Sequence, residues 1–206
     1  MPAKLDLYQT HKKEYATPRE PVLLEVGPAR YLAVAGAGAP GAPGFVEAIG
    51  ALYAVAFTMK MAFKRKGRDY AVSKLEGLWW GPPGHERDFM RLPPARWEWD
   101  LLIRTPDFVA SADVERTCRE LRAKGKPATV ETVRLEKLAE GRCVQVLHVG
   151  PYSAEPATIA AMLAFARARG LEPAGRHHEI YLSDPRRVAA ERLRTILRQP
   201  VTAGSN

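Results

Sequence analysis

One short motif occurs twice in the chain, each time ahead of a run with helical spacing. Residues 24–28 read Leu-Glu-Val-Gly-Pro and residues 147–151 read Leu-His-Val-Gly-Pro. After each helix-like run comes a strand-like segment that carries a glutamate, Glu76 in the first case and Glu179 in the second. A repeated unit of this kind predicts two similar halves related by a pseudo-two-fold axis, where a ligand cleft often lies.

Length and composition fit a single globular domain. The chain has 206 residues, of which 46% are hydrophobic and 26% charged, as in ordinary soluble proteins. We therefore treat residues 1–206 as one domain, with repeats at about residues 22–104 and about residues 130–198. No apolar run approaches the roughly 18 to 20 residues of a bilayer span, and the first residues lack a signal-peptide pattern. These features predict a cytoplasmic protein with no membrane partner.

Charge and cysteine content argue against several kinds of site. The formal net charge is +8, but the basic residues are scattered, so we expect no direct nucleic-acid partner. Cys118 and Cys143 lack CxxC spacing and a set of histidine ligands, and His177 and His178 point to opposite sides of a strand. The glycine-rich residues 36–44 lack the Walker lysine and the GxGxxG spacing of a phosphate loop. We predict no metal site and no cofactor.

The spacing of apolar residues predicts alternating strands and helices. Strands are expected at residues 22–34 (around a turn), 70–80, 97–104, 143–149 and 177–182. Helices are expected at residues 45–64, 111–124, 156–169 and 184–197. Adjacent strands with short turns predict an α+β fold, in which helices cover one face of an antiparallel sheet.

Glu179 is the first candidate for chemistry. On the strand at 177–182, His178 and Ile180 share one face, which we expect to meet the helices. Glu179 then lies on the opposite face, beside His177 and Tyr181, as in a binding site. The alternative is a solvated glutamate on an open antiparallel sheet.

The repeat adds a second carboxylate. Aligning the two strands places Glu76 opposite Glu179 across the pseudo-two-fold axis. Two neighbouring carboxylates would raise at least one pKa and favour proton transfer or cation binding. The alternative is that Glu76 pairs on the surface with Lys74 or Arg104.

Tryptophans and a methionine–phenylalanine stripe offer apolar walls. The four tryptophans fall in two pairs, Trp79 with Trp80 and Trp97 with Trp99, and their rings can stack a flat ligand or hold a cation. Adjacent Trp79 and Trp80 point to opposite faces, so one of them is expected in the site, and the sequence does not say which. For Met59 and Phe63, core packing is the alternative to a ligand contact.

Taken together, these motifs resemble those of the GyrI-like small-molecule-binding proteins. The features that carry the resemblance are residues 4–8, 13–15, Tyr70, 75–80 (Leu-Glu-Gly-Leu-Trp-Trp), Trp97, Trp99, 149–152 (Val-Gly-Pro-Tyr) and 179–185 (Glu-Ile-Tyr-Leu-Ser-Asp-Pro). The resemblance implies two strand-helix-strand-strand repeats that form one antiparallel sheet, with helices on one face and a ligand groove on the other. It extends to the cyclopropanoid cyclopropyl hydrolases and to the effector domains of multidrug-responsive regulators.

The resemblance also implies a function and a set of site residues. Such hydrolases detoxify DNA-alkylating compounds by opening a strained cyclopropane, with a glutamate that orients water. Glu179 matches that base first and Glu76 second. The implied ligand-contacting residues are Tyr152, Tyr181, Trp80, Trp97 and Tyr70 along the pocket, with Tyr53, Met59 and Phe63 at its mouth. The ligand would be a lipophilic, aromatic or cationic small molecule.

Two other functions stay open at this point. The same pocket suits a non-catalytic protein that sequesters or senses drugs, and a less favoured alternative is a protein that inhibits DNA gyrase. The sequence also leaves open whether the chain forms a homodimer.

Overall fold

The computed structural model describes residues 4–86 and 88–204. The strands are β1 (Val22–Val26), β2 (Ala29–Ala37), β3 (Leu75–Trp80), β4 (Glu98–Thr105), β5 (Arg134–Leu138), β6 (Gly141–Val149), β7 (Leu171–Pro173), β8 (His177–Tyr181) and β9 (Arg194–Ala203). The α-helices are α1 (Leu7–Thr10), α2 (Pro43–Arg65), α3 (Ser111–Ala123) and α4 (Glu155–Arg167). Five short 3-10 helices complete the described elements: η1 (Phe89–Arg91), η2 (Pro94–Arg96), η3 (Ala128–Thr132), η4 (Tyr152–Ala154) and η5 (Ala190–Arg192).

The strands form one large sheet with the order β1-β6-β9-β8-β3-β4-β2-β5, and β7 pairs with the end of β9. Every pairing between these strands is antiparallel. The fold is therefore α+β with an antiparallel sheet, which confirms the predicted fold class.

Two similar halves meet at the centre of this sheet, where β3 pairs with β8. The first half is β2-α2-β3-β4 and the second is β6-α4-β8-β9, and their strands mirror each other in the sheet order. Equivalent hydrogen bonds support the match, because Gly38 N donates to Trp97 O and Gly150 N donates to Leu193 O. The strand ahead of each half is exchanged: β1 pairs with β6 of the second half, and β5 pairs with β2 of the first.

The Val-Gly-Pro motif that suggested the repeat does not occupy equivalent positions in the two halves. Residues 24–28 end β1 and turn into β2, whereas residues 147–151 end β6 and lead into α4. The structural counterpart of Gly150 is Gly38. Each glycine directly follows a strand and has a positive φ, +141° at Gly150 and +108° at Gly38. The inference of two halves is correct, although the short motif matched unrelated turns.

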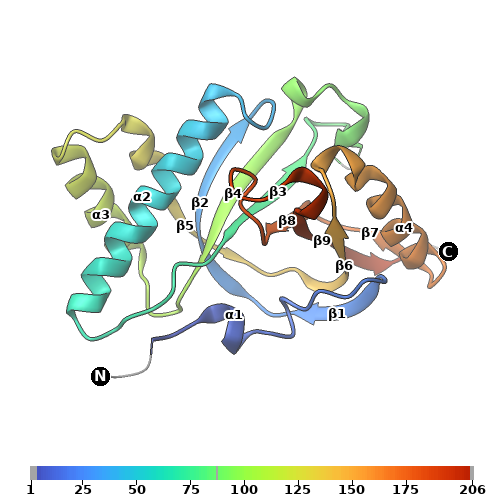
Figure 1. The fold of residues 1–206 in the computed structure, drawn as a ribbon, viewed down its shortest axis with the longest axis horizontal. Helices are drawn as coiled ribbons and strands as arrows, with labels where there is room; N and C mark the ends of the chain where they lie inside the picture. The colour runs from blue at the N-terminus through green and yellow to red at the C-terminus, as the bar shows by residue number, and fades with distance from the viewer. Residues whose placement is uncertain (1–3, 87, 205–206) are drawn as a thin grey trace.

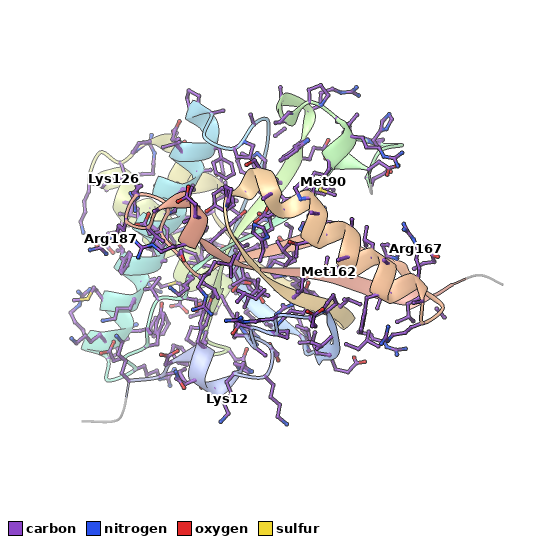
Figure 2. The ribbon with its side chains drawn as sticks, turned by 45° about the vertical axis from the view of Figure 1, so that its right-hand side comes forward. Lys12, Met90, Lys126, Met162, Arg167 and Arg187 are labelled. Carbon is purple, nitrogen blue, oxygen red and sulfur yellow. The ribbon has the colours of Figure 1, made fainter. Side chains whose placement is uncertain are left out.

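The three long helices lie on one face of the sheet (Figure 1). Helix α2 buries Leu52, Val55 and Met59 against β2 and β4, at the spacing that the sequence predicts. Helix α4 lies over the other half, where it buries Met162 and exposes Arg167 (Figure 2). Burial of such apolar stripes is the main stabilising contribution to a layered fold of this kind.

The opposite face is covered by the segment that precedes β1. Tyr15 of this segment packs on Ile180 and Ile196, and Tyr8 stacks on Tyr15 with ring centroids 3.9 Å apart. Gln145 donates hydrogen bonds from its side chain to the carbonyls of Glu14 and Ala16. The sheet therefore has no open face at its centre.

The predicted last helix at residues 184–197 is wrong. Residues Ala190–Arg192 form only the short η5, and β9 begins at Arg194. The Asp184-Pro185 pair resembles a helix start, but Asp184 instead caps a turn by accepting a hydrogen bond from Arg186 N. Because β9 is buried on both faces, it lacks the alternation that would have marked it as a strand.

Helix α2 is, within the described residues, the one helix long and apolar enough to span a bilayer by length and composition alone. Its buried stripe packs on the sheet, as in the core helix of a soluble domain. We therefore interpret it as part of the core.

Candidate functional site

Glu179 lies at the centre of the sheet, on the pseudo-two-fold axis. It pairs directly with Gly77 of β3, and the two residues pair in turn with Leu197 and Leu101 of the outer strands. Because Leu101 and Leu197 occupy matching positions in β4 and β9, Gly77 is the structural counterpart of Glu179. The predicted equivalence of Glu76 and Glu179 is therefore off by one residue.

The face of Glu179 is also the reverse of the prediction. Tyr181, on the same side of β8, packs against the core cluster that contains α2, whereas Ile180 packs against Tyr15 on the other side. Glu179 thus points to the helix-bearing face, between the two halves, and not to a face opposite the helices. The sequence could not reveal that the segment before β1 covers the second face.

A chain of hydrogen bonds holds Glu179. The Tyr181 hydroxyl donates to Glu179 Oε2 at 2.7 Å, and Trp79 Nε1 donates to the Tyr181 oxygen at 3.1 Å. Glu179 Oε1 lies 3.7 Å from His177 Nε2, and the Glu179 side chain is only 12% exposed. Trp79, and not Trp80, is therefore the tryptophan of the pair that reaches this site.

Glu155, which sequence reasoning missed, is the second carboxylate. It is the first residue of α4, is 5% exposed and lies near Glu179 and Thr195, while its Oε1 has no hydrogen-bond partner among the described residues. A glutamate at a helix start usually interacts favourably with the helix dipole, so nothing in its sequence position marks it. Its counterpart in the first half is Pro43, the first residue of α2.

Burial and mutual repulsion control the protonation of this pair. Burial raises the pKa of Glu155, and the negative charge of Glu179 raises it further. Burial also raises the pKa of Glu179, but less, because the Tyr181 donor, the nearby His178 and Glu155 favour its charged form. The two carboxyl groups therefore titrate as a pair, and Glu155 keeps its proton to higher pH than Glu179 does.

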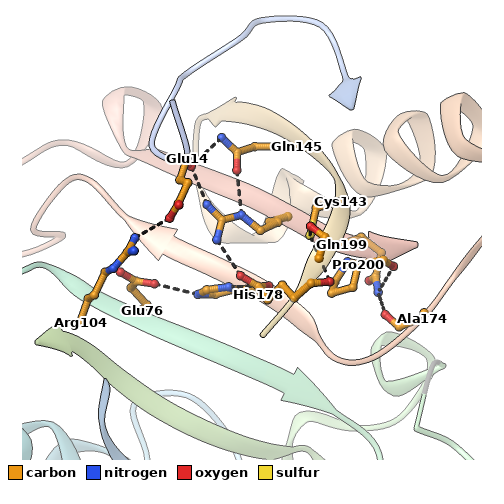
Figure 3. A network of polar contacts seen from close by, with 12 residues as sticks. Glu14, Glu76, Arg104, Cys143, Gln145, Ala174, His178, Gln199 and Pro200 are labelled. Carbon is orange, nitrogen blue, oxygen red and sulfur yellow. Dashed lines mark hydrogen bonds and ion pairs between the residues drawn. The ribbon is translucent and has the colours of Figure 1, made fainter. Parts of the chain in front are cut away.

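Glu76 lies on the other face, in a buried network of alternating charges (Figure 3). Tyr15 donates to Glu76 Oε1 at 3.1 Å, and His178 Nε2 lies 3.0 Å from Glu76 Oε2. Both carboxylate oxygens are thus engaged and the side chain is fully buried. The structure does not bring Glu76 to Glu179, and the predicted surface pairing of Glu76 is also wrong.

The network continues from His178 to the last strand. His178 Nδ1 lies 3.0 Å from Glu140 Oε1, and Arg198 donates to Glu140 Oε2 at 2.7 Å. Burial would lower the pKa of His178, but Glu140 and Glu76 outweigh it and raise this pKa to about 9. Burial would raise the pKa of Glu140, but His178 and Arg198 lower it to about 2. These groups are therefore held in their charged forms.

The predicted aromatic residues divide between site and core. Tyr152 meets Tyr181 edge-on at 5.9 Å and is 40% exposed, so it is a solvent-accessible ring next to Tyr181. Trp97 contacts Trp79 edge-on at 5.8 Å and forms a wall behind it. Tyr53 of α2 is partly buried, packs against the same core cluster as Tyr181, and stacks on Phe57, which is 54% exposed.

The remaining predicted residues lie away from Glu179. Met59 and Phe63 are buried in the α2 core, and Tyr70 meets Phe63 edge-on at 6.3 Å. Trp80 lies on the other face, where the Arg176 guanidinium stacks on its ring at 3.6 Å. For Met59 and Phe63, the core-packing alternative is correct.

One hollow of the surface is not at the carboxylate pair. This depression of about 620 Å³ is lined by Trp80, Gly84, His85, Glu86, Asp88, Gly175 and Arg176. Its side chains are mostly exposed and lie in loops, whereas Glu155 is buried and the Glu179 side chain is only 12% exposed. Perturbed carboxylates among aromatic rings are the stronger sign of function, so we place the candidate site at Glu179. Among the described residues, no three histidine, cysteine or acidic side chains gather as metal ligands.

Comparison with known proteins shows the family of the chain. The model of the GyrI-like small molecule binding domain family matches residues 109–202. A solved structure of an uncharacterized conserved protein from Listeria innocua is 36% identical, with a TM-score of 0.88, over 97% of this chain and 100% of that chain. The chain belongs to the GyrI-like family. The resemblance to this family that the sequence motifs indicated is thereby confirmed.

Other solved structures resemble this GyrI-like chain to different degrees. A hydrolase from Listeria innocua is 36% identical with a TM-score of 0.85, over 97% of this chain and 100% of that one. The EcmrR C-terminal domain has a TM-score of 0.60 but only 10% identity, over 89% of this chain and 98% of that domain, and so shares the fold alone. A search of the curated proteins found no match.

Proposed function

We propose that this GyrI-like protein is a hydrolase of flat, aromatic, electrophilic small molecules. The observation that carries the proposal is the buried Glu155–Glu179 pair on the pseudo-two-fold axis, held by Tyr181 and bordered by aromatic rings. The 36% identical Listeria innocua protein described as a hydrolase supports it. The expected small-molecule ligand agrees with the family to which the chain belongs.

Glu179 is the proposed base. Burial raises the pKa of its carboxyl above the usual range, which makes the carboxylate a better proton acceptor near neutral pH. The Tyr181 hydroxyl donates a hydrogen bond to Glu179 Oε2 at 2.7 Å and fixes its orientation. Such positioning of one reacting group next to another accounts for a large part of enzymatic rate enhancement.

The aromatic side chains suit a flat ligand. Tyr152 at the solvent side and Tyr181 below it meet edge-on, and Trp79 lies next to Tyr181. Rings of this kind bind planar molecules by stacking and edge contacts, and they exclude water from the carboxylates. A cationic ligand is favoured as well, because Glu179 carries negative charge in its ionised form.

The proposed substrates are cyclopropane-bearing DNA-alkylating toxins, as the family resemblance implies. A water oxygen bonds to the ring methylene while Glu179 takes a proton from that water. The strained carbon–carbon bond breaks, and its electron pair passes into the conjugated carbonyl group, which becomes a phenolate and takes up a proton from solvent. The product is the substrate plus one water, and the detoxified compound can no longer alkylate DNA.

The decisive experiment is incubation of the purified protein with a duocarmycin-type cyclopropane drug, followed by mass spectrometry. We expect a product heavier by one water, which disappears in Glu179→Gln. The matched control is Glu25→Gln, which changes an exposed carboxylate on the edge strand β1 and should leave product formation intact.

Two results would overturn the hydrolase proposal. Tight binding with unchanged drug mass would assign the protein to the sequestering or sensing class. Full turnover in Glu179→Gln would remove Glu179 as the base.

A further inference from the structure

Gly77 lies directly beneath the hydrogen-bond chain that holds Glu179. It pairs with Glu179 across the β3–β8 ladder, at the pseudo-two-fold axis. A Cβ atom built at Gly77 would lie 2.9 Å from Trp79 Nε1 and 3.0 Å from the Tyr181 hydroxyl oxygen. Carbon atoms rarely approach so closely, so any side chain here would displace one or both groups.

The backbone itself does not demand a glycine at this position. Gly77 is absent from the residues with positive φ, so its conformation suits any amino acid. Glycine inside a strand lowers stability relative to alanine, because it loses more conformational freedom on folding. The feature that distinguishes glycine here is therefore the room that its missing side chain leaves above the Cα atom.

That space is filled by the two donors that orient the candidate base. Trp79 Nε1 donates to the Tyr181 oxygen at 3.1 Å, and the Tyr181 hydroxyl donates to Glu179 Oε2 at 2.7 Å. Hydrogen bonds in such a chain strengthen one another. Tyr181 thus occupies Oε2, and Glu179 Oε1 lies 3.7 Å from His177 Nε2.

We propose that Gly77 is a positioning residue of the site, whose missing side chain lets the Trp79–Tyr181 chain reach Glu179. The proposal deepens the proposed function, and it rests on that function for its kinetic measurement. It assigns the two halves different tasks: the second half supplies the carboxylates, and the first half supplies the glycine and Trp79.

A second strand glycine provides the matched control. A Cβ atom at Gly36 of β2 would lie 2.2 Å from the ring of Trp99, which is closer still, but no hydrogen-bond chain to Glu179 crosses it. Gly36→Ala should therefore lower stability without changing how Glu179 behaves. Gly77→Ala should do both.

The test combines kinetics with a direct titration of Glu179. We expect Gly77→Ala to lower kcat by about 10²-fold with little change in KM, as for a misplaced reacting group. Tyr181→Phe should have a similar effect, and the double variant should lose little more, because both changes break one chain. Gly36→Ala should retain the wild-type kcat in its folded fraction.

The titration uses ¹³C-labelled glutamate and NMR, and needs no turnover. Loss of the Tyr181 donor disfavours the carboxylate form, so the Glu179 titration should move to higher pH in Gly77→Ala and Tyr181→Phe but not in Gly36→Ala. The groups that face Glu179 stay the same in all variants: Glu155 from α4, Tyr152 from η4, His177 on its own strand and the His178 charge behind it.

The results distinguish the positioning role of Gly77 from the proposed hydrolase activity. An unchanged titration and kcat in folded Gly77→Ala would overturn the positioning role. A shifted titration in a protein that hydrolyses nothing would support the positioning role and reject the hydrolase. If Gly77→Ala does not fold, Gly77→Ala/Trp79→Phe removes the ring atoms that the new Cβ would meet, and a wild-type titration in that variant would equally overturn the role.

Discussion

The two faces of the sheet carry buried carboxylates with opposite electrostatics. On the helix-bearing face, Glu155 and Glu179 are like groups, and the negative charge of Glu179 raises the pKa of Glu155. On the other face, the charges of Glu76, His178 and Glu140 alternate in sign, and Glu140 also forms an ion pair with Arg198. Glu179 and His178 are neighbours in β8, so a single strand serves both arrangements.

The comparison shows that burial alone does not indicate function. On the other face each charge has a partner of opposite sign, so protonation states are fixed and the network joins strands to the segment before β1. On the helix-bearing face the two acids compete for ionisation, and the pair can gain or lose a proton near neutral pH. We therefore expect chemistry at the Glu155–Glu179 pair on the helix-bearing face, and structural specificity from the network of Glu76, His178 and Glu140 on the other face.

The largest expected difference between the faces is catalytic. Glu179→Gln keeps the shape and the hydrogen-bonding capacity of the side chain but removes the base, and should lower kcat by about 10²- to 10⁴-fold, the usual effect of losing a positioned base. Glu76→Gln, measured in parallel on its folded fraction, should retain kcat within a few-fold. Equal losses in the two variants would contradict the division between the faces.

The next effect concerns stability and falls on the other face. Glu140→Gln removes the anion that both His178 and Arg198 contact, and should lower the free energy of unfolding by about 3–5 kcal/mol, the range for a broken buried ion pair. Urea titration of the variant measures this loss, with Glu25→Gln as an exposed control. A loss below about 1 kcal/mol would show that the network contributes little.

The sequence predicted the local elements better than their faces. The helix at 45–64 and the strands at 97–104 and 143–149 lie close to α2, β4 and β6, because their apolar spacing is set by local geometry. Which face of β8 meets the helices depends on what covers the other face, and the segment before β1 shows no periodic pattern. The strand β9 was missed for a related reason, since it is buried on both sides.

The residues of the candidate site were predicted in part, and each wrong prediction has a physical cause. Glu179 was a candidate because a glutamate lies beside His177 and Tyr181 on one strand face, and the structure keeps these three together. Glu76 was added through an alignment one residue out of register, and a slip of one residue moves a side chain to the opposite face. Glu155 comes from a distant helix start, and only the tertiary fold brings it to Glu179.

Acid should weaken the face of Glu76 through Glu140. The pKa of Glu140 is lowered to about 2 in the folded protein, so its stabilising contribution is present above its unfolded pKa of about 4.3 and is lost as the pH falls toward 2. The full loss is about 3 kcal/mol, of which about 2 kcal/mol has occurred at pH 3. Buried His177 on the helix-bearing face, whose pKa is lowered to about 4, gives a separate loss that starts as the pH falls below about 6.5. Unfolding measured from pH 7 to pH 3 tests this, and the slope should be smaller in Glu140→Gln.

Base should weaken the helix-bearing face through Glu155. The raised pKa of Glu155 means that the folded state holds a proton that the unfolded chain has released, so stability is greatest below about pH 4.3 for this group and declines as the pH rises toward the folded pKa. The decline is at most about 1.4 kcal/mol per pH unit. Glu155→Gln, a neutral mimic of the protonated acid, should flatten this slope between pH 6 and pH 9, while Glu25→Gln, at an exposed position, leaves it unchanged. If both variants keep the wild-type slope, Glu155 is ionised in the folded protein, and the two faces differ less than their contacts indicate.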